Sequence, residues 1–248
     1  MRNHNVISKM NHTEHIKQLE DEGYSIIPPI YSESEILSIG KMISELEVEC
    51  LAVIKSKDLF AIRQLFNEIP ALKKLVFNKN LLALIQALPS ENKFFISKAI
   101  YFDKPKDSNW FVAYHQDLVI NVSERKEIVG FKNWTNKRDQ IGVQPPLNYL
   151  KRTVTLRIHL DDTDKTNGAL RIIPNSHKKG VIRSGNTPDI SDEIRCDVKR
   201  GGVMLMKPLM LHASSRSKGN SKRRVIHLEF CDLDLPHPLI WKEKNSTK

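Results

Sequence analysis

The spacing of the apolar residues changes near residue 90, and this change constrains the fold more than any other feature of the chain. Before it, apolar side chains recur mainly at helical spacing; after it, they gather in short runs rich in aromatic and β-branched residues. Helices followed by strands indicate an α+β, mainly β, domain. We expect a helical part at about residues 13–90 and a core at about 93–235 that closes as a jelly roll, with the helices packed on one sheet.

The first segments carry recognisable start signals. Residues 1–12 are polar and lack a period, so we expect them to be flexible. Residues 23–28 have the composition of a short strand. Ser32 and Glu35 have the spacing of a capping box, which predicts a helix that runs from there to about Val53.

A second helical region is expected from about Asp58 to Leu88, interrupted by Pro70. The later segments with the composition of strands are residues 94–102, 111–122, 153–160, 169–173, 201–211 and 223–231. The segment 123–150 is longer than a simple connecting loop, and we expect it to form a lid over a site. Trp134 in this lid is a candidate for stacking on a substrate, or for an anchor that holds the lid down.

Composition favours one soluble domain over residues 13–248, because this length is within the range of single β-rich domains. Cys50, Cys196 and Cys231 are odd in number and widely spaced, which suits reduced thiols. The longest apolar stretches are far shorter than the roughly 20 residues that cross a bilayer. Residues 1–9 contain no apolar signal segment, so we expect a cytoplasmic protein without a membrane anchor.

The formal net charge of +10 raises the question of a nucleic-acid partner. A basic run strengthens the case for such a partner, with cations at Arg216, Lys218, Lys222, Arg223 and Arg224. Basic residues elsewhere are scattered, and no recognised nucleic-acid-binding motif accompanies them. We therefore do not expect nucleic acid as the main partner, and the charge equally suits an anionic small substrate.

His115 and Asp117 are two residues apart, so on a β-strand their side chains leave the same face and can bind one ion. A second histidine from a distant strand, His212, completes two imidazoles and one carboxylate. That set is the facial triad of non-haem iron(II) oxygenases, which leaves coordination positions open for chemistry. Taken alone, His-x-Asp would equally describe a surface pair joined by a hydrogen bond.

Adjacent strand residues point to opposite faces, so only one of Arg223 and Arg224 can enter the interior. Arg223 lies eleven residues after His212, and its planar fork can bind the far carboxylate of 2-oxoglutarate. If Arg223 points inward, His227 and Glu229 do so too. Buried polar groups of this kind need partners or a function, which makes His227 a candidate substrate contact.

Arg157 and His159 pose the same question on the strand before Asp161, because either could face a substrate. We favour Arg157 as a substrate or co-substrate contact; the alternative is that both are exposed or internally satisfied. His177 follows a turn-like Pro-Asn-Ser stretch and is interpreted as structural rather than as a metal ligand.

The motifs together resemble the phytanoyl-CoA dioxygenase family of Fe(II)/2-oxoglutarate oxygenases over nearly the whole chain. Similar blocks, in the family's order, are Gly23-Tyr24, Tyr101-Phe102-Asp103-Lys104-Pro105, His115-Gln116-Asp117, Leu160-Asp161-Asp162, Asn167-Gly168-Ala169-Leu170 and Ile173-Pro174-Asn175-Ser176-His177-Lys178-Lys179-Gly180. The last block has the distal histidine followed by two serines, an asparagine and an arginine, at His212, Ser214, Asn220, Ser221 and Arg223.

The resemblance implies a double-stranded β-helix, the cupin-like jelly roll, with iron held by His115, Asp117 and His212. It implies that 2-oxoglutarate chelates the metal and that Arg223, helped by Ser214, binds its other carboxylate. The family oxidises 2-oxoglutarate with O2 to succinate and CO2 and hydroxylates an aliphatic carbon. We therefore expect a hydroxylase of a small molecule.

Departures from the family concern the substrate rather than the chemistry. Tyr114 stands where tryptophan is frequent, Asn175 replaces a common glycine, and the lid is longer than in the founding members. Related halogenases replace the carboxylate ligand by a small residue, whereas Asp117 is present here. Hydroxylation is expected, with desaturation or ring formation as alternatives.

Two other functions are compatible with the sequence. One is an oxygenase acting on a nucleic acid or protein, with the basic run as its docking surface. The other is a barrel that binds a ligand without turnover, against which the complete set of motif residues argues. The identity of the substrate, the pathway and the oligomeric state do not follow from the residues.

Overall fold

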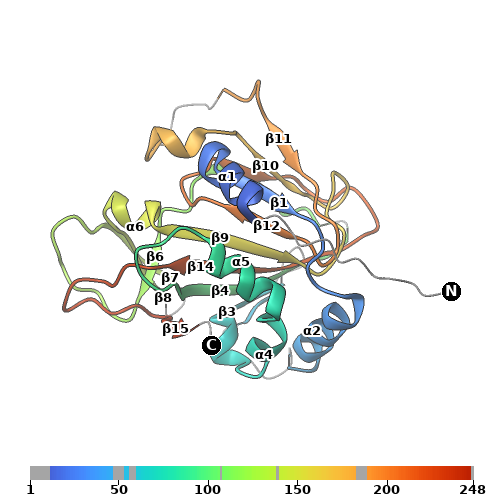
Figure 1. Cartoon of the computed structure of the whole chain (residues 1–248), viewed down its shortest axis with the longest axis horizontal. Coiled ribbons are helices and arrows are strands. Elements are labelled where there is room, and N and C mark those ends of the chain that lie inside the picture. The colour runs from blue at the N-terminus through green and yellow to red at the C-terminus, as the bar shows by residue number, and fades with distance from the viewer. Residues whose placement is uncertain are drawn as a thin grey trace.

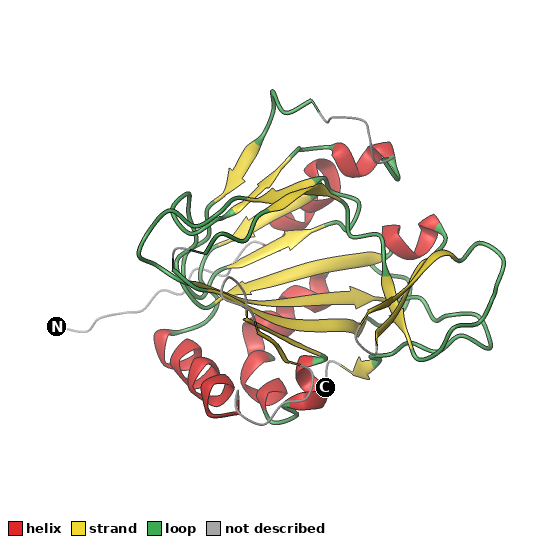
Figure 2. Ribbon diagram, turned by 180° about the vertical axis from the view of Figure 1, so that it is seen from behind, coloured by secondary structure: helices red, strands yellow, loops and turns green. Residues whose placement is uncertain are grey.

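Two antiparallel sheets form the jelly roll, in which the larger sheet supports the site and the smaller sheet covers it (Figures 1 and 2). The computed structural model describes residues 12–46, 53–55, 60–106, 108–137, 140–182 and 189–246. The larger sheet contains β1 (Tyr24–Ile27), β2 (Val53–Lys55), β3 (Phe60–Arg63), β4 (Phe95–Lys104), β9 (Thr153–His159), β12 (Val203–Met206), β14 (Arg223–Cys231) and β15 (Asn245–Ser246). Its order is β1-β12-β9-β14-β4-β3-β2, and β15 also pairs with β4.

The smaller sheet lies across the interior from β9 and β14. It contains β5 (Val112–His115), β10 (Leu170–Ile172), β11 (Ile194–Cys196) and β13 (His212–Ser214), in the order β11-β10-β13-β5. A further sheet at one end of the molecule contains β6 (Ile120–Val122), β7 (Lys132–Lys137) and β8 (Gln140–Gln144), in the order β6-β8-β7. The jelly roll expected from the run of strands is confirmed.

Helices cover the outer face of the larger sheet, where Figure 1 shows α5 in front of β14 and β4. The helices are α1 (His12–Glu22), α2 (Glu33–Leu46), α3 (Leu65–Glu68), α4 (Leu72–Val76), α5 (Lys79–Ala87) and α6 (Leu147–Lys151), and η1 is a short 3-10 helix (Ser176–Lys179). Within the described residues, no helix is both long and apolar enough to cross a membrane.

The main hydrophobic core lies between these helices and the larger sheet. On β14, Ile226, Leu228 and Phe230 are fully buried on the helix side. Alternation sends the intervening residues of the strand to the other face, toward the interior of the jelly roll. One strand therefore builds the core with one set of residues and the interior wall with the other.

The capping box at the start of α2 forms as predicted. The Ser32 amide donates to Glu35 Oε2 at 2.7 Å, and the Glu35 amide donates to Ser32 Oγ at 3.3 Å. The helix ends at Leu46, however, and residues 53–55 form β2, so the prediction of a helix to Val53 is wrong. Residues 1–11 and 47–52, with Cys50, lie outside the described residues.

The second helical region is shorter than expected. Residues 60–63 form β3, which pairs with β4 through Ala61 and Phe102, and only then does the chain enter α3. Four residues with three apolar positions fit a helix turn and a strand equally well, so the pairing with β4 decided the outcome. The interruption at Pro70 is confirmed, because α3 ends at Glu68 and α4 begins at Leu72.

The cysteines that the structure describes, Cys196 and Cys231, are buried free thiols. Burial raises the pKa of the Cys196 thiol to about 12. A thiol in that state is a poor nucleophile and behaves as a small apolar group.

Leu228→Ala should lower the free energy of unfolding by about 2–5 kcal/mol, because it leaves a cavity in the main core. Urea unfolding monitored by circular dichroism measures the change. Leu37 on α2 is 57% exposed, and Leu37→Ala is the matched control with an expected effect within about 0.5 kcal/mol. Equal losses from both substitutions would contradict the assignment of Leu228 to the core.

Candidate active site

The sheet pairing brings the two histidines together. His115 is the last residue of β5 and His212 is the first of β13, and the two lie directly opposite each other in the antiparallel pair. Asp117 lies in the loop after β5, so the expectation that it shares a strand face with His115 is wrong. Its backbone amide donates to the Pro208 carbonyl at 2.9 Å, and this bond turns the loop back toward the histidines.

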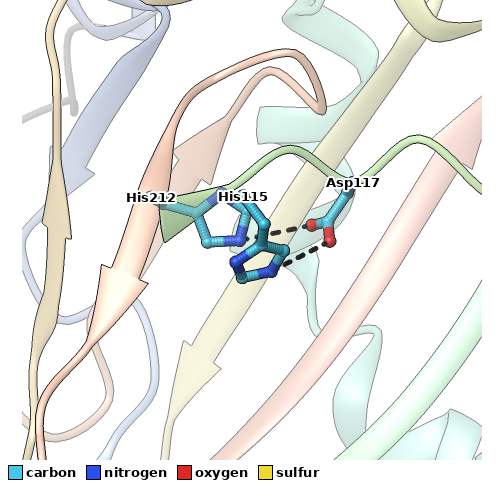
Figure 3. A group of neighbouring side chains, drawn as sticks. All are labelled: His115, Asp117 and His212. Carbon is cyan, nitrogen blue, oxygen red and sulfur yellow. Dashed lines mark ion pairs between the residues drawn. The ribbon is translucent and has the colours of Figure 1, made fainter. Parts of the chain in front are cut away.

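The three side chains converge on one point, as Figure 3 shows. His115 Nε2 lies 3.8 Å from Asp117 Oδ1, and His212 Nε2 lies 3.7 Å from Asp117 Oδ2. The imidazole rings have centroids 4.2 Å apart and are inclined at 50°. One ligand atom from each of the three residues lies within 4.8 Å of the others, so the group could hold one metal ion.

Backbone bonds orient both histidines for this role. His115 Nδ1 lies 2.9 Å from the Ala113 carbonyl, and His212 Nδ1 lies 2.9 Å from the Met210 carbonyl. A carbonyl oxygen only accepts, so each Nδ1 carries the proton and each Nε2 keeps its lone pair. Metal-binding histidines are commonly fixed in this way, by a bond from the other ring nitrogen.

The electrostatics of the site also suit a metal. Burial lowers the pKa of His212 to about 4. Burial alone would raise the pKa of Asp117, but the neighbouring His212, His227 and Lys98 lower it to about 2. At neutral pH the carboxylate is therefore ionised and the His212 imidazole is neutral, which are the forms that bind a metal ion.

Gln116, between the two predicted ligands, points away from them and fastens the surrounding loops. Its amide nitrogen donates to the carbonyls of Gly180 and Leu209 at 2.8 and 2.6 Å, and its oxygen accepts from the Ile182 amide at 2.8 Å. These three hydrogen bonds of the Gln116 side chain make the loop that carries Asp117 more rigid.

A cavity of about 310 Å³ opens between the two sheets beside this group. It is lined by Ala61, Arg63, Lys98, Ile100, Phe102, Trp110, Val112, His115, Asp117, Arg157, Leu170, His212, Ser214, Arg223, His227 and Glu229. The volume is at the lower end of the range of ligand pockets, roughly 300–1,000 Å³.

Arg223 enters the cavity from the first position of β14 and is 3% exposed. Its Nη1 donates to the Gly168 carbonyl, which also accepts from Ser214 Oγ at 3.0 Å. Gly168 has a φ of +78°, and a Cβ there would lie 2.5 Å from the Ser215 carbonyl oxygen, so the approach requires glycine.

The Arg223 guanidinium lacks a carboxylate partner among the described residues, and its Nε is buried without a hydrogen bond. Burial, together with the neighbouring Arg157, lowers the pKa of this guanidinium to about 9. An uncompensated buried cation is costly, and an anion in the cavity would relieve the cost. The site therefore fits both a metal ion and a carboxylate-bearing molecule.

A polar network lines the wall opposite the histidines. Arg157 Nη1 lies 3.0 Å from His227 Nδ1, His227 Nε2 lies 3.3 Å from Glu229 Oε1, and the Lys98 ammonium lies 2.7 Å from the same oxygen. Lys98 also donates to the Val119 carbonyl at 2.9 Å. Burial lowers the pKa of Arg157 to about 10, although Asp117 opposes the shift.

Arg224 takes the other face of β14, as alternation requires, and donates through Nε and Nη2 to both oxygens of Asp161 at 2.9 and 2.7 Å. Arg223 points inward and Arg216 stacks on the Phe111 ring at 5.3 Å. The basic run is thus divided between the interior, an ion pair and the surface. It does not form a single docking stripe.

Two other histidines lie outside the cavity wall. His159 bonds through Nδ1 to Thr163 Oγ1 at 2.7 Å, whereas its Nε2 is buried without a hydrogen-bond partner, so the group is only half satisfied. His177 lies in η1, and its Nε2 is 3.3 Å from the Glu20 carbonyl. The structural interpretation of His177 agrees with this position.

Residues 123–150, which we expected to form a lid, contribute strands β7 and β8 to a small sheet with a core of its own. Phe131, Val143 and Tyr149 pack with Trp241, and no described residue between 123 and 150 lines the cavity. Trp134 packs on this second core, with the Arg125 guanidinium 5.5 Å from its ring centroid. This packing agrees with the alternative that Trp134 is an anchor, while a lid over the site and a contact of Trp134 with the substrate stay predictions.

Sequence reasoning missed Lys98, Arg63 and Trp110 as cavity residues. Lys98 had a detectable signal, because it is a cation between the apolar residues of the first part of β4, where a charge needs an internal partner. Arg63 was hidden in a segment interpreted as helix. Trp110 lies outside any strand, where alternation gives no information.

A two-histidine, one-carboxylate group inside a jelly roll, beside an unpaired buried arginine, defines the class of non-haem iron oxygenases. The family model for phytanoyl-CoA dioxygenase (PhyH) matches residues 19–225, and the chain belongs to this family. The protein is accordingly a 2-oxoglutarate-dependent dioxygenase, with iron(II), 2-oxoglutarate and O2 as its cofactor and co-substrates. No curated protein matches the chain by sequence.

Solved structures with the same fold have low sequence identity. EctD from S. alaskensis in its apoform has a TM-score of 0.69 at 16% identity and covers 96% of this chain and 82% of its own. HygX from Streptomyces hygroscopicus, solved with nickel, 2-oxoglutarate and hygromycin B bound, has a TM-score of 0.63 at 14% identity, with 88% and 86% covered. The non-heme alpha ketoglutarate dependent carbocyclase SnoK from nogalamycin biosynthesis has a TM-score of 0.63 at 17% identity, with 89% and 84% covered. At these identities the similarity is one of fold.

Glu243 should make stability depend on pH. It is 2% exposed, its Oε2 accepts from the Ala99 amide at 3.0 Å, and its Oε1 has no hydrogen-bond partner. Burial raises its pKa from 4.5 to about 8. The folded state then holds a proton that the unfolded state has lost, so this contribution to stability is present below pH 4.5 and disappears as the pH rises to about 8.

Glu243→Gln removes that dependence. The free energy of unfolding of the variant, relative to wild type, should increase between about pH 5 and pH 8, measured by urea unfolding at several pH values. Exposed Glu45→Gln reports the effect of net charge alone. A difference between Glu243→Gln and wild type that does not vary with pH would contradict the raised pKa.

Proposed function

We propose that this protein hydroxylates an aliphatic carbon of a small molecule, with iron held by His115, Asp117 and His212. Arg223 and Ser214 bind the far carboxylate of 2-oxoglutarate. One observation carries the proposal: the free Nε2 atoms of both histidines face Asp117 in the same cavity that contains the unpaired Arg223 guanidinium. The three side chains would hold the metal ion, and the guanidinium would bind the carboxylate of the co-substrate.

The chain's own residues determine how the reactants are held. Iron(II) in such a site supplies activation of O2 for the oxidation of 2-oxoglutarate and of a C–H bond in the substrate. The two imidazoles and the carboxylate would hold the ion, and all three residues line the cavity in which the reactants would bind. The Gly168 carbonyl holds Nη1 of Arg223, and the guanidinium is thereby fixed before a carboxylate binds.

The size of the cavity supports a small substrate. About 310 Å³ has to accommodate 2-oxoglutarate as well as the part of the substrate that reacts. HygX, a protein of the same fold, has been solved with hygromycin B bound, which shows that the fold admits small molecules. The division of the basic run removes the main argument for a nucleic-acid substrate.

Anaerobic titration of the metal-free protein with iron(II) and 2-oxoglutarate tests the assignment. The visible charge-transfer band of the chelate should appear with wild type and be absent with His115→Ala. Arg223→Gln should require about 10- to 100-fold more 2-oxoglutarate, because it removes charge-assisted hydrogen bonds. Arg195→Gln on the surface is the control. A normal titration by Arg223→Gln would contradict its role.

Asp117 should direct the reaction to hydroxylation. When a substrate has been found by succinate release, its product should gain one oxygen atom and no chlorine, even with chloride in excess. Mass spectrometry of the product decides the matter. Chlorinated product from the wild-type protein would show that the carboxylate does not occupy the coordination position proposed for it.

A further inference from the structure

Arg157 is a buried cation that the iron and 2-oxoglutarate do not account for. It lies on β9, is 7% exposed, and lines the cavity. Among the described residues it makes no ion pair, and its Nε is buried without a partner. Its Nη1 forms a hydrogen bond to the imidazole of His227, which does not neutralise the charge of the guanidinium.

The hydrogen-bond network determines which part of Arg157 is free. An arginine only donates, so His227 Nδ1 accepts from Nη1 of Arg157 and carries no proton. His227 then donates through Nε2 to Glu229, which Lys98 also contacts. The network holds Nη1 in place and leaves Nε, which is buried, without a hydrogen-bond partner. The Nε edge of a guanidinium can bind a carboxylate through parallel hydrogen bonds.

A count of the formal charges on the buried cavity side chains and the active-site aspartate leaves Arg157 in excess. Arg63, which is only partly buried and donates to Gln140 Oε1 at 2.6 Å, is left out of this count. With the proposed cofactor and co-substrate bound, the charges of iron(II), Asp117, doubly charged 2-oxoglutarate and Arg223 cancel. Lys98 and Glu229 cancel each other as an ion pair of 2.7 Å. Arg157 then remains as a buried positive charge without a counter-ion, which is costly unless the next molecule to enter supplies one.

We propose that Arg157 binds a carboxylate of the primary substrate. This inference rests on the proposed function, because the charge count assumes that iron and 2-oxoglutarate occupy the site. The same cavity is lined by apolar side chains from Ile100, Phe102, Trp110 and Val112, so the substrate is a small carboxylic acid with an apolar carbon skeleton. The Phe102 and Trp110 rings, with centroids 6.2 Å apart, provide the apolar surface for that skeleton.

The surface charge is consistent with an anionic substrate. Arg216 stacks on Phe111, which directly precedes the cavity residue Val112, and the chain has a formal net charge of +10. A positive field of this kind raises the local concentration of anions and their rate of association. It acts on any anion, whereas Arg157 selects one that enters the cavity.

A second metal ion is the competing interpretation of this wall, because ligand atoms of Asp117, His227 and Glu229 also lie within 4.8 Å of one another. The network argues against it. The His227 proton faces Glu229, and the Lys98 ammonium lies 2.7 Å from the same carboxylate. An ammonium ion next to the carboxylate repels a metal cation and already neutralises the charge that would bind it.

The experiment compares acids with their uncharged amides. Protein loaded anaerobically with iron(II) and 2-oxoglutarate is titrated with butyrate and butyramide, phenylacetate and phenylacetamide, and N-acetylvaline and its amide. Binding is followed by the change of the visible chelate band and by calorimetry, so turnover is not required. At least one acid should bind at least about tenfold more tightly than its amide while the chelate band persists.

Variants assign the preference to Arg157. Arg157→Gln should abolish the preference for the acid, Arg157→Lys should retain part of it, and both should bind 2-oxoglutarate within about threefold of wild type. Arg195→Gln removes one positive charge at the surface, where Arg195 pairs with Asp197, and should keep the full preference. Circular dichroism and the chelate band show whether each variant is folded, and the acid-to-amide ratio of the wild type tests the proposal without any variant.

Several outcomes would overturn the inference. These are no binding by any of the acids, equal binding of acid and amide, loss of the chelate band as the acid displaces 2-oxoglutarate, or an acid preference that survives in Arg157→Gln. Much weaker 2-oxoglutarate binding in Arg157→Gln would assign the guanidinium to the co-substrate instead. Absence of the chelate band from the wild type is a different failure, which would contradict the proposed function and this inference with it.

Discussion

The alternation of side chains along β14 is the constraint on which the structure depends. Its odd-numbered polar residues face the cavity, and its even-numbered apolar residues from Ile226 to Phe230 face the helices. Because β14 pairs with β4 on one side and β9 on the other, its register fixes which residues of those strands face the same way. Lys98 and Arg157 enter the cavity for that reason, and a shift by one residue would exchange core and site.

Charge balance explains why such a polar interior is tolerated. Lys98 and Glu229 satisfy each other, and His227 relays a hydrogen bond from Arg157 to that pair. Arg223 and Arg157 both line the cavity, and each has a buried Nε without a hydrogen-bond partner. The protein thus bears an unfavourable electrostatic energy in its free form, and bound anions relieve it. Affinity for anionic molecules follows from the same feature that costs stability.

Much of this architecture could be predicted from the sequence. The capping box, the break at Pro70 and the run of strands gave the helical layer and the jelly roll, because each depends on local spacing. Alternation required Arg223 and Arg224 to point to opposite faces, and the spacing from His212 selected Arg223 as the inward one. The spatial group of His115, Asp117 and His212 was likewise anticipated from motif order, although the loop position of Asp117 was not.

The differences between expectation and structure came from pairings between distant segments. Residues 60–63 became a strand because β4 offered an edge, and residues 123–150 became a sheet because Trp241 and its neighbours supplied an apolar surface. Neither partner is visible in a local window, so spacing could not identify them. Lys98 was overlooked for a similar reason, because its partner Glu229 lies on the neighbouring strand β14, far away in the sequence.

The position of Asp117 outside the strand has an evolutionary consequence. Its backbone is held by a hydrogen bond from its amide to the Pro208 carbonyl, which any residue except proline could make, and the loop is fastened by Gln116. The side chain at position 117 therefore contributes nothing to the sheet pairing and can be exchanged without disturbing the fold. A lineage built on this scaffold could alter the chemistry at the metal by a single substitution, while the two histidines remain tied to the strands.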